Sequence, residues 1–162
     1  MKRVRIFLSW CHRDKLLKDA LAVHLMPALS LFSDLKVEWW QDSHLTCGED
    51  LLPGVVDRID EADFGLLLLS TPYFGSAFIR KYELCRFAGA GADKGSLPVA
   101  LSALPEFGDH HDLGGVEKQI VFFADGGQTF ADLSGARRRK FANDLAASIR
   151  RRVLDLNGYR PL

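Results

Sequence analysis

The sequence FGLLLLS at residues 64–70 decides the fold, because its apolar positions run on without the alternation of a half-exposed strand. Such a run is typical of a central strand in a parallel sheet, where helices cover both faces. It is far shorter than the roughly 18 apolar residues that a membrane-spanning helix needs. Thr71 and Pro72 follow and end the strand. We therefore expect an α/β fold built around residues 64–70.

Apolar runs on either side of this segment supply the other strands of the sheet. Their composition and length match buried strands. They occupy residues 3–9, 37–41, 97–101 and 119–123.

Segments with helical period separate most of these strands. The first begins at Asp14, and we expect Pro27 to kink or interrupt it because proline lacks the N–H. Further helices are predicted over residues 52–61, 75–90 and 135–156, with an irregular loop at 102–118. The resulting order, βαβαβαββα with short connections, favours a parallel α/β sandwich.

Length and charge restrict the function classes. The chain has 162 residues and 18.1 kDa, which fits one domain, residues 1–162. Its formal net charge is zero, whereas a protein that binds nucleic acid through its overall field is basic. Residues 1–5 lack the apolar stretch of a signal peptide, and three cysteines without close spacing favour free thiols. We therefore expect a cytoplasmic protein that binds neither membranes nor nucleic acid.

Several common chemistries lack their motifs. The sequence has no phosphate loop of the G-x-x-x-x-G-K-[ST] type and no G-x-S-x-G elbow. His110 and His111 are metal-ligand types, but no third His or Cys stands at a ligand spacing, so no metal site is expected. The basic clusters at 137–140 and 150–152 are interpreted as a solvated helix face, with an interaction surface as the lesser alternative.

Polar residues follow three of the predicted strands. In an open parallel sheet, ligands bind beyond the carboxyl ends of the strands. Residues 9–12, 40–42 and 70–72 stand at such ends. On the following helix, Glu83 falls between apolar side chains at 79 and 87. From the pattern alone, a surface salt bridge near Arg80 or Lys81 is favoured over a functional role for Glu83.

FLSW at residues 7–10, residues 37–42, residues 59–70 and residues 73–84 form four motifs in order along the chain. Together they resemble the TIR domain family (Toll/interleukin-receptor homology) in its bacterial form. FLSW at residues 7–10, with His12 and Asp14, resembles the first-strand motif. Residues 37–42 with Gly48 resemble the second strand and the loop after it, and residues 59–70 the central strand. The fourth is YFGSAFIRKYEL at residues 73–84, which includes Glu83. The tail from residue 119 onward fits only loosely.

The resemblance implies both a fold and an activity. The fold is flavodoxin-like, a three-layer sandwich with a five-stranded parallel sheet in the order 2-1-3-4-5. The activity is cleavage of the nicotinamide–ribose bond of NAD⁺ to nicotinamide and ADP-ribose or a cyclic isomer. It implies activation by self-association with other TIR domains, in bacterial anti-phage or cell-suicide defence. A sensor domain in the same or a partner chain is a further expected partner, and residues 1–162 would then be the N-terminal part of a longer protein.

The resemblance also assigns residues. Glu83 is implied as the catalytic residue, with NAD⁺ as substrate and no other cofactor. The positions implied to contact substrate are Ser9, Trp10, Trp40, Asp42 and Ile79. The loop implied to gate the site and mediate assembly spans 43–52 and includes His44, Leu45 and Gly48.

The chemistry suits a site with one carboxylate. Nicotinamide leaves NAD⁺ as a neutral base, so no general acid is needed, and a carboxylate can stabilise the oxocarbenium ion. Trp10 or Trp40 could offer an aromatic face to a ring, or could simply pack. The alternative from another class is a non-catalytic adaptor that binds other proteins. A weaker alternative is cleavage or transfer on another nucleoside.

Overall fold

The computed structural model describes residues 1–41, 51–107 and 110–156. A four-stranded parallel sheet forms its centre, in the order β2-β1-β3-β4. Its strands are β1 (Lys2–Ser9), β2 (Leu35–Trp40), β3 (Phe64–Leu69) and β4 (Gly95–Ala100). The predicted α/β class and the strand order 2-1-3-4 are therefore confirmed.

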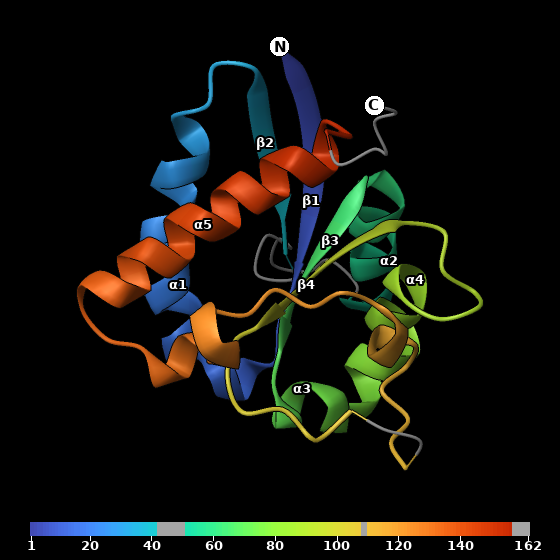
Figure 1. Cartoon of the computed structure of the whole chain (residues 1–162). Coiled ribbons are helices and arrows are strands. Elements are labelled where there is room, and N and C mark those ends of the chain that lie inside the picture. The colour runs from blue at the N-terminus through green and yellow to red at the C-terminus, as the bar shows by residue number, and fades with distance from the viewer. Residues whose placement is uncertain (42–50, 108–109, 157–162) are drawn as a thin grey trace, which may run out of the picture.

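Helices cover both faces of the sheet (Figure 1). Two long helices, α1 (Lys15–Ser30) and α5 (Ala136–Val153), pack together on one face. The opposite face carries α2 (Leu51–Glu61), α3 (Thr71–Gly75), a π-helix labelled η3 (Ile79–Leu84) and α4 (Cys85–Phe87). Short 3-10 turns complete the described chain: η1 (His12–Asp14), η4 (Val116–Lys118), η5 (Asp125–Gly127) and η6 (Phe130–Asp132).

Two separate apolar clusters correspond to the two faces. Ile6 and Leu8 of β1 pack with α1 and α5, whereas Phe7 packs with α2, η3 and α4. This division follows from the strand's period of two, which sends successive side chains to opposite faces. Ser9 therefore lies on the same face as Phe7, toward η3.

The predicted fifth strand, residues 119–123, is not formed. Its place beside β4 is taken by a single bridge, in which the Phe122 N–H donates to the Pro98 carbonyl and the Ala100 N–H donates to the Phe122 carbonyl, each at 2.9 Å. Continuing this parallel ladder toward the amino end would require the N–H of residue 98 to donate to the carbonyl of Ile120. Proline has no N–H, so the ladder stops there.

Two helix predictions also differ from the structure. Pro27 does not interrupt α1, which runs on to Ser30. The helix predicted over 75–90 is shorter: helical residues run from 77 to 87, with the π-helix η3 between two α-helical ends, and α3 is a separate helix before it. Ser70 begins this series, since its hydroxyl accepts a hydrogen bond from the Tyr73 N–H and so caps α3.

Candidate functional site

Glu83 and the end of β1 meet on the face that carries the short helices. The Ser9 hydroxyl donates a hydrogen bond of 2.8 Å to the Glu83 carboxylate. Glu83 is only 5% exposed and Ser9 is fully buried. The interpretation of Glu83 as a surface salt-bridge residue is therefore wrong, because its carboxylate lies inside the fold beside a strand end.

Tyr73 supplies the next contact in this cluster. Its phenol oxygen lies 2.9 Å from Ser9 Oγ. A serine hydroxyl has one proton, and here that proton goes to Glu83, so Ser9 accepts from the phenol. The result is a directed chain from Tyr73 through Ser9 to Glu83. Polar groups buried this deeply need such partners, because each unpaired one costs about 1–3 kcal/mol.

The Tyr73 phenol stays protonated under ordinary conditions. Its complete burial raises its pKa well above the ordinary value, the Glu83 charge acts in the same direction, and the hydrogen bond to Ser9 opposes them. Tyr73 is therefore a permanent donor to Ser9, which keeps the Ser9 proton directed at the carboxylate.

The backbone that carries Glu83 is unusual. Residues 79–84 form a π-helix, which is rare and occurs mostly as a local insertion at functional sites. The wider turn brings Ile79, Glu83 and Leu84 to buried positions, so two apolar side chains and a carboxylate share one side of the turn. Directly after this π-helix, the Cys85 thiol donates to the Lys81 carbonyl at 3.0 Å.

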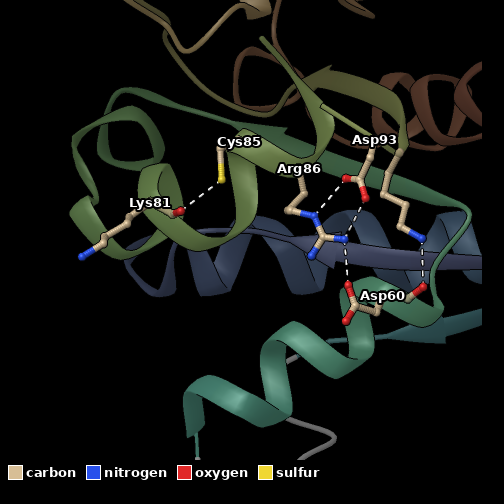
Figure 2. A network of polar contacts seen from close by, with 6 residues as sticks. Asp60, Lys81, Cys85, Arg86 and Asp93 are labelled. Atoms are coloured by element: carbon tan, nitrogen blue, oxygen red, sulfur yellow. Dashed lines mark hydrogen bonds and ion pairs between the residues drawn. The ribbon is translucent and has the colours of Figure 1, made fainter. Parts of the chain in front are cut away.

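An ion-pair network holds the end of this irregular helix (Figure 2). The Arg86 guanidinium donates to both carboxylate oxygens of Asp93 at 2.9 Å and to Asp60 of α2 at 2.7 Å. The Arg86 guanidinium lowers the pKa of Asp93 below its ordinary value. The network thus ties α4 to α2 and to the loop before β4, and it anchors the segment that positions Glu83.

The other substrate-contact residues implied by the sequence separate into two groups. Ile79 is 4% exposed in the same apolar cluster as Tyr73, and Trp40 at the end of β2 packs against that cluster. Trp10 instead packs with α1 and α5, where its ring stacks on His12 at 4.8 Å. The structure therefore brings Ile79 and Trp40 to the Glu83 side of the sheet but places the Trp10 ring on the other side.

Four of the predicted positions lie outside the described residues: Asp42, His44, Leu45 and Gly48. Sequence reasoning missed the contribution of Tyr73 to the cluster. Its signal was the Ser-x-Pro start of a helix at residues 70–72, which fixes the backbone at position 73.

A separate hollow lies along the open edge of the sheet. It has a volume of about 720 Å³ and is formed by β4, residues 119–123 and α5. Its walls mix apolar side chains with polar ones such as Lys94, Gln119 and Arg152, and the Ile120 side chain in the lining is 95% exposed. Its described lining contains no aspartate or glutamate.

Within the described residues, no helix is both long and apolar enough to cross a membrane. The same residues contain no group of three or more His, Cys, Asp or Glu side chains placed to bind a metal ion. His110 and His111 thus belong to no such group.

Neither the protein-family models nor the curated proteins searched give a match to this chain.

Proposed function

We propose that the chain is a TIR-type NAD⁺ glycohydrolase in which Glu83 is the catalytic carboxylate. The observation that carries the proposal is the Ser9–Glu83 hydrogen bond of 2.8 Å at the carboxyl end of β1. Ligands of open parallel sheets bind at such ends. A carboxylate that is 5% exposed there is held in one orientation and is largely shielded from water.

In the proposed reaction, the bond between C1′ of the ribose and the nicotinamide nitrogen breaks. Its electron pair goes to the pyridinium ring, which leaves as neutral nicotinamide. The sugar becomes an oxocarbenium ion, and water adds at C1′ and releases one proton, giving ADP-ribose. Intramolecular attack by an adenine nitrogen in place of water gives a cyclic isomer.

Glu83 would bind the ribose hydroxyls and offset the positive charge that develops on the sugar. At about 4 Å and an effective dielectric constant near 20, one such charge pair contributes on the order of 4 kcal/mol. That corresponds to roughly a thousandfold in rate. The Ser9 hydroxyl and Tyr73 phenol hold the carboxylate before substrate binds, so little reorganisation is needed during the reaction.

The near-complete burial of Glu83 also fits activation by self-association. A sugar can reach the carboxylate only if the site opens further, so the dilute chain should turn over NAD⁺ slowly. Contacts between copies that favour an open form would raise the rate. Such activation, with a role in bacterial defence, is the reading that the TIR resemblance supports.

The test is NAD⁺ consumption at rising protein concentration and under crowding, with nicotinamide and the sugar product separated by chromatography. Glu83→Gln preserves size and the acceptor for Ser9 but removes the charge, so turnover should fall by about a thousandfold or more. Glu83→Ala should do the same. Glu61→Gln, which changes an exposed glutamate at the end of α2, is the matched control and should keep wild-type turnover.

One result would overturn the proposal in favour of a non-catalytic adaptor. If clustering by fusion to an oligomerising partner gives no NAD⁺ loss above that of Glu83→Gln, the buried carboxylate is structural. Binding of other TIR domains by the same inactive chain would then establish the scaffold role. Cleavage of a different nucleoside in a substrate panel would instead redirect the reaction to that substrate.

A further inference from the structure

A second buried carboxylate, Asp14, lies near the Glu83 cluster and has no part in the mechanism above. It is 7% exposed and belongs to η1, just beyond the end of β1. It accepts a hydrogen bond from the hydroxyl of Ser70, which is fully buried. Ser9 is the last residue of β1 and Ser70 directly follows β3, so a serine at the carboxyl end of each central strand donates to a buried carboxylate.

Tyr73 connects these two serine–carboxylate pairs. The Ser70 hydroxyl gives its one proton to Asp14, and it accepts from the Tyr73 N–H at 3.1 Å. The phenol of the same residue lies 2.9 Å from Ser9. Tyr73 therefore donates at both ends, through its backbone toward Asp14 and through its side chain toward Glu83.

The tyrosine is rigid enough to transmit position. It is fully buried, and its ring meets the Phe74 ring edge-on at a centroid distance of 5.5 Å. Its backbone is fixed by the Ser70 cap at the start of α3. A shift of Ser70 thus moves the start of α3, and the rigid ring carries that shift to the phenol and on to Ser9.

We propose that Asp14 and Ser70 are positioning residues, which set the orientation of the Glu83 carboxylate through Tyr73 and Ser9. This proposal rests on the proposed function where it concerns turnover. In this proposal Asp14 acts as the hydrogen-bond acceptor for the Ser70 hydroxyl, and its charge is not required. It does not touch the reacting atoms.

If Asp14 acts as an acceptor, two substitutions at this position should differ in their effect on turnover. Asp14→Asn keeps a side-chain oxygen for Ser70, whereas Asp14→Ala removes it. We expect Asp14→Ala to lower kcat by about tenfold to a hundredfold with KM changed less than about twofold, since misplacement of a reacting group acts on the chemical step. Asp14→Asn should stay within about threefold of wild type. Asp144→Ala, at an exposed aspartate of α5, is the control.

Ser70→Ala is the second variant, in case Asp14→Ala fails to fold. It removes both the donor to Asp14 and the acceptor for the Tyr73 N–H, and it should lower kcat at least as much as Asp14→Ala. If Asp14→Ala and Ser70→Ala both fold and keep wild-type kcat, the positioning role is wrong. If Asp14→Asn is as inactive as Asp14→Ala, the charge matters and the acceptor role is wrong.

A double-mutant cycle on unfolding tests the same connection without any enzymatic reaction. Asp14→Ala and Ser9→Ala change residues on opposite sides of Tyr73 in the chain of hydrogen bonds. We expect the double variant to lose less stability than the sum of the two single variants, because either change already breaks the connection. Additive losses would overturn the proposal. Absence of NAD⁺ turnover in the wild type, together with coupling in this cycle, would reject the enzymatic function and retain the positioning role.

Discussion

The two helical layers of the molecule differ sharply in regularity. On one face, α1 and α5 are continuous helices of 16 and 18 residues. On the other, α2 has 11 residues and α3 has five, and the helical residues 77–87 change to a π-helix over the six residues of η3. The buried hydroxyls of Ser9 and Tyr73 and the Glu83 carboxylate all belong to the second layer or face it. Regular packing supplies stability in the first layer, while irregular backbone places polar groups in the second.

The largest expected effect is a loss of stability, without a loss of turnover, when the core of the regular layer is truncated. Phe141 of α5 is 2% exposed and packs against Phe122 and Phe130 at centroid distances of 5.1 and 5.4 Å. Phe141→Ala should lower the free energy of unfolding by about 3–5 kcal/mol, as expected for a truncated core aromatic, with turnover per folded molecule unchanged. Denaturant unfolding and NAD⁺ assays at low temperature measure the two effects.

Leu84→Ala is the matched change in the irregular layer. Leu84 is 1% exposed and directly follows Glu83 on the π-helix. Its truncation should cost about 2–5 kcal/mol and also reduce turnover, because the turn that carries Glu83 loses its packing. If Phe141→Ala and Leu84→Ala change turnover per folded molecule equally, the inference that only the layer containing η3 positions Glu83 is wrong.

A smaller effect is expected where the irregular layer meets the sheet. A Cβ atom on Gly65 of β3 would stand 2.6 Å from the Phe87 ring, so Gly65→Ala forces α4 away from the sheet. Overpacking of this kind typically costs about 1–3 kcal/mol. Gly75→Ala, where a Cβ would meet no atom within 4 Å, is the control and should be neutral or slightly stabilising. Thermal unfolding compares the pair, and equal stabilities of the two variants would contradict the close approach of Phe87.

The smallest effect concerns pH. Burial raises the pKa of Tyr73 in the folded protein, whereas the unfolded phenol ionises near 10. Stability from this group is therefore fully present below about pH 10 and is lost as the pH rises further, at up to about 1.4 kcal/mol per pH unit. Tyr73→Phe should reduce the loss of stability above pH 10. While the proteins are folded, the tyrosinate absorbance of wild type and Tyr73→Phe should rise equally with pH, because the buried phenol does not ionise. A wild-type absorbance step near pH 10 that Tyr73→Phe removes would show that the phenol is not buried.

The regular parts of the fold were predictable because their periodicity is strong. The closing helix was predicted over 135–156 and runs from Ala136 to Val153, and the apolar run 64–70 predicted β3 at the centre of the sheet. The observed elements differ from the predicted ones only by a few residues at their ends. The place of Glu83 beside the strand ends was implied only by the TIR resemblance, because the pattern alone favoured a surface salt bridge.

The irregular parts depended on interactions that sequence periodicity does not contain. The π-helix arises within a segment whose pattern fits an ordinary α-helix, so the division at Ile79 had no local signal. The contact between Tyr73 and Ser9 joins residues 64 positions apart and depends on how α3 is capped. Pro98 was different, because a proline within a predicted inner strand already argues against a full partner on its N–H side.

Pro98 also has a consequence for how copies of this chain can meet. An uncovered strand is a template on which another chain can add by backbone pairing, and such growth has no natural end. The missing donor at position 98 interrupts that template in the middle of β4. We therefore expect the missing N–H at position 98 to hinder uncontrolled pairing of β4 with the sheet of another copy.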